Sequence, residues 1–427
     1  MKRTVYFLLL TLFVACYGNT AEAQIWQKIF KKEKPKKKAP VKKAPGKKTP
    51  VAKPFKKREI DYPVSVKKGR YRVDVLVPLY LDELVQNDKV TFKGKLPAKA
   101  MSGMEFYEGV KLAADTLTSL GFDIDVYVHD IQDANNTPAF LSKNKGLDSS
   151  DLIIGAVQSQ QIPAFASFAK GGRINFISAL SPSDADVTDN PYFTLLQPTL
   201  QTHSERIMTA LKNKYPRSRP ILLHRNSVTV DQSAYKYLTG VDSSMKKLLV
   251  NELPTRQQLK SLLDSNSTNV LIASVVDVVY AEKLLKQLVT LFPSYRFEVY
   301  GMPSWTTMAS LKNAGNYPYM AIYITAPFYY DASTPAGQAL ANEYKKAFNV
   351  GKPGEMVYRG YETMYWYAYL LAKYGTIFNT EVDDNGGAPF TKFDVKAKWD
   401  KDNNLYYLEN LHLYWFRYSD GSFTVTP

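Results

Sequence analysis

From about residue 70 onward the chain alternates between strand-like and helix-like segments, and this alternation limits its possible folds more than any other feature. Residues 72–79 are apolar and β-branched, whereas residues 103–120 place apolar side chains along one helical face. Further strands are predicted at 123–129, 151–156 and 173–179, with helices at 138–144 and 160–169. Strands interleaved with helices form βαβ units and a parallel sheet.

The same rhythm restarts after residue 200, which predicts a second parallel sheet. The predicted strands are 220–224, 269–275, 295–301 and 319–326, and the helices are 203–214, 255–264 and 277–291. Helices return at 334–348 and 355–374, and short strands follow at 405–408, 411–418 and 422–425. A chain of 427 residues suits two or three folding units. Because ligands bind at the carboxyl ends of parallel strands, two such lobes indicate a hinged binding protein.

Positive charge is concentrated in one short segment. The formal net charge is +15, and residues 28–58 supply +14 of it through fourteen Lys and one Arg against one Glu. The folded body is therefore close to neutral, which argues against nucleic acid as a partner. Recurrent Pro and like charges predict a disordered basic linker over residues 24–62. The stretch Lys31–Arg58 is either a solvated spacer or a tether to an anionic envelope polymer or lipid.

The N-terminus carries an export signal. Residues 1–23 combine a basic start, a short apolar stretch and an Ala-x-Ala site at 21–23, which predicts a signal peptide and a periplasmic protein. The alternative is a lipid anchor at Cys16, which is the single cysteine of the chain. The body can therefore hold no disulfide and no thiolate metal site. The four His are far apart in sequence, so we expect no metal and no cofactor.

A family resemblance rests on several segments in a fixed order. These are VLVPL at 75–79, FYEGVKLA at 106–113, DLIIGA at 151–156 with QSQ at 158–160, NFIS at 175–178 with SPS at 181–183, NPYF at 190–193 with QP at 197–198, and GYET at 360–363. Together they resemble the type I periplasmic binding proteins of the branched-chain amino-acid-binding class, also used as receptor ligand-binding regions. Residues 75–108 look closest to a bacterial envelope subgroup often fused to LysM modules, whose place the Lys/Pro segment takes here.

The resemblance implies an α/β fold of two Rossmann-like parallel-sheet lobes joined by interlobe crossovers. The domain would span residues 63–427. The expected lobe 1 covers about 70–198 and 327–395, and the expected lobe 2 covers about 199–326 and 396–427.

The resemblance also implies where a ligand would bind. In the family, hydroxyls and backbone N–H groups on first-lobe loops hold the α-carboxylate of an amino acid. Ser159 and Ser181 match these loops, and Gln158 and Gln160 flank the first of them. Loop hydroxyls suit an anion, but Ser and Gln at a helix start also act as caps, so both readings stay open.

The second lobe offers less for an ammonium group. Family members supply acids from loops that correspond to 199–202 and 302–305, and neither loop is acidic here, although the second contains Ser304. Asp277, which opens a helix, is either a substitute or an N-cap. Tyr80, Trp305 and Tyr361 could line an aromatic cleft for a sugar ring, a peptide or an apolar acid.

The sequence therefore predicts an exported solute-binding protein that captures a small amino-acid-like, peptide or sugar ligand for an ABC importer or a sensor. The alternative is a non-catalytic envelope scaffold with a degenerate pocket, tethered by its basic segment to peptidoglycan or a membrane surface. The chain has no G-x-S-x-G, G-x-G-x-x-G or Walker A motif, so we do not expect an enzyme.

Overall fold

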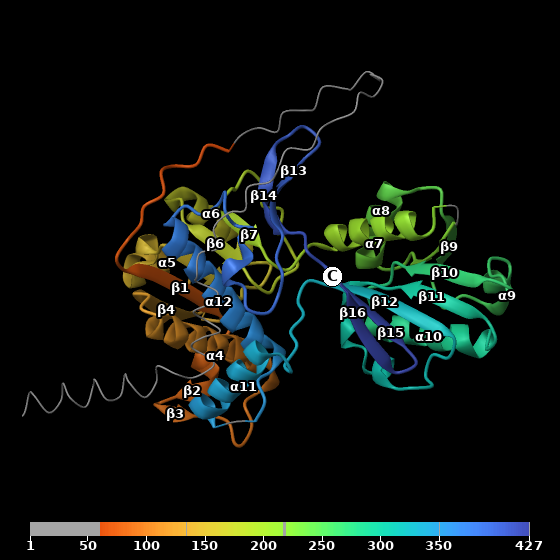
Figure 1. The fold of residues 1–427 in the computed structure, drawn as a ribbon, viewed down its shortest axis with the longest axis horizontal. Coiled ribbons are helices and arrows are strands. Elements are labelled where there is room, and N and C mark those ends of the chain that lie inside the picture. The colour runs from red at the N-terminus through yellow and green to blue at the C-terminus, as the bar shows by residue number, and fades with distance from the viewer. Residues whose placement is uncertain (1–59, 134, 217–218, 350, 427) are drawn as a thin grey trace, which may run out of the picture.

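The structure is a computed structural model that describes residues 60–133, 135–216, 219–349 and 351–426. The predicted signal peptide, Cys16 and most of the predicted linker lie outside these ranges. The described chain forms two lobes, one at the left and one at the right of Figure 1, each built on a seven-stranded sheet. Within the described ranges, every helix is too short or too polar to cross a lipid bilayer.

The sheet of the first lobe has the strand order β13-β14-β7-β6-β5-β1-β4. Its strands are β1 (Tyr71–Val77), β4 (Ile124–Asp130), β5 (Leu152–Gly155), β6 (Asn175–Ser178), β7 (Phe193–Leu195), β13 (Val395–Trp399) and β14 (Leu405–Asn410). Its helices are α3 (Leu81–Leu84), α4 (Ala98–Ser119), α5 (Pro138–Lys145), α6 (Ile162–Gly172), α11 (Pro335–Phe348) and α12 (Glu355–Tyr374). A small hairpin, β2 (Val85–Gln86) with β3 (Lys89–Val90), extends the loop after α3. All pairings in the large sheet are parallel except that of β13 with β14.

The sheet of the second lobe has the order β16-β15-β12-β11-β10-β8-β9. Its strands are β8 (Ile221–Arg225), β9 (Lys246–Val250), β10 (Thr268–Ala273), β11 (Arg296–Tyr300), β12 (Met320–Ala326), β15 (Tyr414–Ser419) and β16 (Ser422–Thr426). Its helices are α7 (Leu200–Lys214), α8 (Thr229–Val241), α9 (Arg256–Lys260) and α10 (Val278–Leu291). The strands from β8 to β12 are parallel, and β15 and β16 add an antiparallel edge. The predicted α/β class with two mainly parallel sheets is confirmed.

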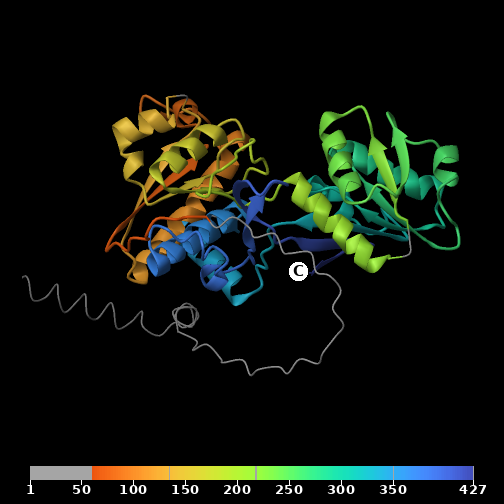
Figure 2. The same cartoon turned by 90° about the horizontal axis from the view of Figure 1, so that it is seen from above.

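The chain passes between the lobes at the carboxyl ends of the strands (Figure 2). β7 ends at Leu195 and α7 begins at Leu200, while β14 ends at Asn410 and β15 begins at Tyr414. Because β1, β4, β5 and β6 run parallel to β7, their carboxyl ends share the edge nearest the second lobe. β12 ends at Ala326 and leads back to α11, so the carboxyl ends of β8, β10 and β11 are at the edge nearest the first lobe. The loops that bind ligands in open α/β sheets therefore face each other.

One part of the expected lobe boundary differs from the sheets. We expected residues 396–427 in the second lobe, but β14 pairs in parallel with β7 in the first sheet, and only β15 and β16 belong to the second. The reason is burial: Leu408 joins the first apolar core, and Tyr407 packs edge-on against Phe193. The consecutive strands β14 and β15 thus enter different sheets.

The first lobe is held together by close packing of α4 on α12. A Cβ added at Gly109 would lie 2.1 Å from the carbonyl oxygen of Val357, and one at Gly360 would lie 2.0 Å from that of Phe106. The two helices can approach this closely only because both positions are glycine.

Candidate ligand-binding site

In the first lobe, the loops after β1 and β4 are joined by one carboxylate. Asp130 Oδ1 accepts the Leu79 N–H at 2.9 Å, and Oδ2 accepts the Leu81 N–H at 2.6 Å. Tyr80 lies between these two amides in the left-handed region, with φ of 59°. The Lys99 ammonium stands 4.9 Å from the centre of its ring. Tyr80 is half-buried at the carboxyl end of β1, and its role as a ligand contact remains a prediction.

The loop after β5 carries three of the predicted ligand residues. Gln158 and Gln160 are exposed and Ser159 is half-buried. The N-cap of α6 is Gln161, with no capping side-chain bond, so Ser159 does not cap this helix. Gln161 instead accepts the Gln158 N–H at 3.1 Å and donates to the Ile131 carbonyl at 2.8 Å. Gln161, which the sequence did not single out, therefore ties the loops after β4 and β5 together.

Ser181 follows β6 and is turned inward. Its side chain is buried, and its Oγ accepts the Ser183 N–H at 3.3 Å. The hydroxyl thus shapes its own loop, and a hydroxyl that accepts a bond can also donate one.

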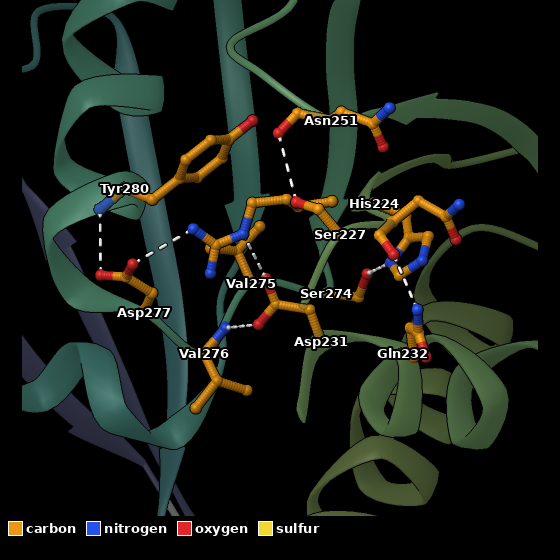
Figure 3. A network of polar contacts seen from close by, with 12 residues as sticks. His224, Ser227, Asp231, Gln232, Asn251, Ser274, Val275, Val276, Asp277 and Tyr280 are labelled. Carbon is orange, nitrogen blue, oxygen red and sulfur yellow. Dashed lines mark hydrogen bonds and ion pairs between the residues drawn. The ribbon is translucent and has the colours of Figure 1, made fainter. Parts of the chain in front are cut away.

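The second lobe contributes an ion-pair network that includes Asp231 and Asp277 (Figure 3). Its central cation, Arg225, was not among the predicted site residues. Arg225 ends β8, and its Nε donates to Asp231 at 2.7 Å while Nη1 donates to Asp277 at 3.1 Å. The guanidinium also lies 4.5 Å from the centre of the Tyr280 ring. The sequence signal that could have identified Arg225 is its position as a basic residue directly after the predicted strand 220–224.

Asp277 is the N-cap of α10, which was one of the two roles predicted for it. Its Oδ1 accepts the N–H groups of Val279 at 2.9 Å and Tyr280 at 3.2 Å. Burial acts to raise the pKa of Asp277, but the hydrogen bonds from Tyr280 and Arg225 outweigh it and lower the pKa below its usual value. The carboxylate is ionised and already has a cationic partner. An incoming ammonium group would therefore share it with Arg225.

Buried hydrogen bonds and ring packing hold the residues of this network in place. Asp231 is fully buried and accepts the Val276 N–H at 2.8 Å through Oδ1. His224 Nδ1 lies 2.9 Å from Ser274 Oγ, and the His224 ring stacks on Tyr235. Burial lowers the pKa of His224, so this imidazole is neutral at pH 7.

Ser304 joins the same part of the second lobe, but Trp305 does not line a cleft. Ser304 Oγ donates to the Val276 carbonyl at 2.6 Å, next to Asp277. Trp305 is 0% exposed, donates from Nε1 to the Val275 carbonyl at 2.7 Å and packs over Gly301. The expectation of a Trp305 ring facing a ligand is contradicted, because the indole fills the core under the loop.

Tyr361 is also a core residue. It is 3% exposed, stacks on Tyr365, and its hydroxyl lies 3.3 Å from Thr116 Oγ1 on α4. Burial raises the pKa of its phenol. The prediction that Tyr361 lines an aromatic cleft is therefore wrong in this structure, and Tyr80 alone of the three aromatics remains a predicted ligand contact.

The described residues include no group of three His, Cys, Asp or Glu side chains placed to hold a metal ion. A cavity of about 650 Å³ lies at the amino ends of β7 and β14, the edge of the first lobe away from the predicted site. Its lining includes Asp61, Trp399 and Tyr406. It is therefore separate from the loops that face the second lobe.

Comparison with known proteins agrees with this architecture. Residues 97–383 match the family model described as periplasmic binding protein. The search of curated proteins gave no match.

Among solved structures, a putative branched-chain amino acid ABC transporter from Rhodospirillum rubrum is 12% identical, with a TM-score of 0.59 over 84% of this chain and 100% of that one. An ABC transporter substrate-binding protein from Desulfitobacterium hafniense in complex with Leu is 14% identical, with a TM-score of 0.52 over 84% and 100%. Full-length LpoA from Haemophilus influenzae is 14% identical, with a TM-score of 0.54 over 85% of this chain and 60% of that one. At such identities these structures show the fold alone, whereas the family model covers most of the chain, and the chain therefore belongs to the periplasmic binding protein family.

Proposed function

We propose that this protein is exported and captures a small solute between its two lobes, without catalysis. The observation that carries the proposal is the placement of both sets of strand-end loops toward each other. The first lobe brings Tyr80, Ser159 and Ser181 to this edge, and the second brings Asp277 and Ser304. Hydroxyls, loop amides and one ionised carboxylate are groups that bind a polar solute.

We propose an amino-acid-like ligand as the first class to test. Its carboxylate would meet the loop amides and hydroxyls around Ser159 and Ser181, and its ammonium would meet Asp277. The structurally similar R. rubrum protein is described as a putative branched-chain amino acid ABC transporter, and the D. hafniense protein was solved with Leu. An ABC importer or a sensor would then be the partner. Short peptides and sugars are the other ligand classes to be tested.

The alternative proposal is an envelope scaffold whose pocket no longer binds a solute. Three observations favour it: Asp277 is already paired with Arg225, Trp305 is withdrawn into the core, and the basic stretch Lys31–Arg58 suits an anionic polymer or lipid. In that case the two lobes would serve as a rigid platform.

The experiment that separates the two is thermal unfolding of the full-length protein against amino acids, short peptides, sugars, nucleosides and muropeptides. A ligand at 100 times its Kd adds about 2.7 kcal/mol to the free energy of unfolding. Solute capture predicts a saturable rise in Tm for one chemical class, reduced in Ser159→Ala.

The matched control is Ser119→Ala, because Ser119 lies exposed at the end of α4 and, within the part of the chain that the structure describes, its hydroxyl bonds to the Thr116 carbonyl of the same helix. It should keep the full rise in Tm. A well-folded protein whose Tm responds to no class would support the scaffold instead.

A further inference from the structure

We propose that the cavity at the amino ends of β7 and β14 is a second binding site, which takes the Lys and Arg side chains of residues 53–58 of the same chain. This cavity lies at the edge of the first lobe away from the loops that face the second lobe. The proposal does not depend on which solute the lobes capture. It concerns where the end of the basic segment binds on the folded body.

The cavity has the size of a binding site and is built from three parts of the chain. Its volume of about 650 Å³ lies within the range of ligand pockets, roughly 300–1,000 Å³. Its described walls are residues 60–61, the loop 188–191 before β7 and the tip of the β13–β14 hairpin. This hairpin stands at the top of the first lobe in Figure 1.

Hydrogen bonds fix these walls relative to one another. The Asp189 N–H donates to the Leu405 carbonyl at 2.8 Å, which joins the loop before β7 to the hairpin. The Tyr62 hydroxyl donates to the Pro191 carbonyl at 3.4 Å, and its ring packs edge-on against Tyr192 with 6.0 Å between the ring centres. The cavity is therefore a feature of the folded lobe, and residues just before Tyr62 form one of its walls.

The lining is acidic, and two of its carboxylates lack a cation among the described residues. Asp61, Asp189 and Asp400 all line the cavity. Asp189 pairs with Lys170 at 2.7 Å, whereas no Lys or Arg of the described ranges forms an ion pair with Asp61 or Asp400. Hydrogen bonds from Asn404 lower the pKa of Asp400, so this carboxylate is ionised at neutral pH. A hollow lined by charge of one sign attracts the opposite charge.

Two aromatic rings narrow the choice of cation. Trp399 ends β13 and Tyr406 lies in β14, and both are half-buried in the cavity lining. The faces of Trp and Tyr rings attract ammonium and guanidinium groups. Lys and Arg side chains combine such a charged end with an apolar stem, which packs on aromatic and aliphatic surface. The lining therefore fits Lys and Arg side chains better than a bare metal cation.

The basic segment of this chain supplies such side chains next to the cavity. Residues 28–58 carry a net charge of +14, and Arg58 lies two residues before Ile60, which lines the cavity. Residues 53–58 read KPFKKR, with four cations. At about 3.6 Å per residue or less, they reach at most roughly 7–25 Å from Ile60. A short covalent link gives them a high effective concentration, of about millimolar order, which a free amine lacks.

Binding in the cavity would limit the use of the segment elsewhere. Cations held by Asp61 and Asp400 are not free to pair with an anionic polymer or lipid. The cavity would therefore weaken any tether that the basic segment forms.

The test measures where the end of the segment lies in the full-length protein. Spin labels are placed at Ala52→Cys, directly before residues 53–58, and at Lys143→Cys, which is exposed on α5 of the first lobe. Cys16→Ser removes the single native cysteine. Electron–electron double resonance gives the distribution of distances between the labels. Binding predicts a narrow component at low salt, which is lost in about 1 M NaCl, where the screening length is about 3 Å.

Variants of the cavity assign the contact to its carboxylates. Asp61→Asn combined with Asp400→Asn should remove most of the narrow component. An Asn side chain at position 400 keeps an oxygen that can accept the turn bond from the Asn404 N–H. The matched control is Asp402→Asn, because Asp402 is exposed on the same turn but does not line the cavity. This control should keep the narrow component.

Variants of the segment assign the contact to its last cations. Lys56→Gln, Lys57→Gln and Arg58→Gln in one chain should remove most of the narrow component. The matched control replaces three cations farther from the cavity, at residues 36–38, with Gln and should keep it. The segment variants leave the folded lobes unaltered, so they give a result even if a cavity variant does not fold.

Two results would overturn the proposal. One is a broad distribution in the wild type at low salt, which would show that residues 53–58 do not occupy the cavity. The other is an equal loss of the narrow component in a control and its matched variant, with native circular dichroism in both. That result would show attraction to the overall charge of the protein instead of binding at this site.

Discussion

At the residue scale, His203 is a titratable group kept neutral by its surroundings. Burial lowers the pKa of His203 to about 3, against 6.5 for the free side chain. Between these values the unfolded chain binds a proton that the native protein excludes. Stability contributed by the neutral imidazole is therefore present above pH 6.5 and is lost as the pH falls toward 3, by about 1.4 kcal/mol per pH unit.

The check is urea unfolding of the wild type and His203→Gln from pH 7 to pH 4. Carboxylates also make the free energy of unfolding depend on pH, but they do so equally in both proteins. The difference between the two free energies at each pH therefore isolates the contribution of His203. We expect the difference to shrink as the pH falls. Parallel curves would contradict burial of a neutral His203.

The Arg225 network predicts a large cost for one change of charge. Asp231→Asn leaves Arg225 without its buried partner, and breaking a buried pair costs about 3–5 kcal/mol. The control is Asp189→Asn, because the carboxylate of Asp189 is 82% exposed and its pair with Lys170 is worth about 0–1 kcal/mol. The free energy of unfolding in urea measures both. Similar costs for the two variants would be inconsistent with the network as described.

Single residues were predicted unevenly, and the reason is geometric. Loop residues such as Ser159 could be placed, because the end of a predicted parallel strand fixes the edge on which a loop lies. Trp305 and Tyr361 could not, because spacing does not say whether an aromatic ring turns toward solvent or core. Arg225 was missed because its partners come from elsewhere in the chain: Asp231 lies in the first turn of α8, and Asp277 is the N-cap of α10.

At the element scale, the close packing of α4 on α12 leaves no room for a side chain at Gly360. Gly360→Ala should lower the free energy of unfolding by roughly 1–3 kcal/mol, because the new Cβ would press on the Phe106 backbone. Gly240→Ala is the control: this helical glycine of α8 has nothing within 4 Å of an added Cβ. It should be neutral or stabilising by about 0.5–1 kcal/mol. Equal losses in the two variants would contradict the close helix contact.

Most elements of both sheets could be predicted from buried apolar runs, such as Leu152–Gly155 in β5. The pair α8 and β9 was missed. Thr229–Val241 mixes β-branched and polar residues, and Lys246–Val250 is an edge strand with exposed side chains, so neither gives a strong periodic signal. The sheet to which β14 belongs depends on its partner β7, which local sequence does not contain.

At the scale of the whole molecule, the two lobes and their facing strand ends follow from connectivity. Each crossover joins the edges of the two sheets at which the parallel strands end, and the proposed ligand would bind between these edges. Glu409 of β14 accepts the hydroxyls of Thr199 and Thr202, so the first sheet also holds the amino end of α7, a helix of the second lobe.

The most direct measurement of solute capture is the interlobe distance as a ligand is added. Spin labels at Lys143→Cys on α5 and Lys260→Cys on α9, one on each lobe and both exposed, report this distance by electron–electron double resonance once Cys16→Ser has removed the single native cysteine. The compound added is the one that raises Tm most in the panel. Capture between the lobes predicts that the distance shortens and saturates with the concentration that saturates Tm, and that Ser159→Ala shifts both midpoints together. A compound that raises Tm without changing the distance, or a panel in which no compound changes either, would contradict the account.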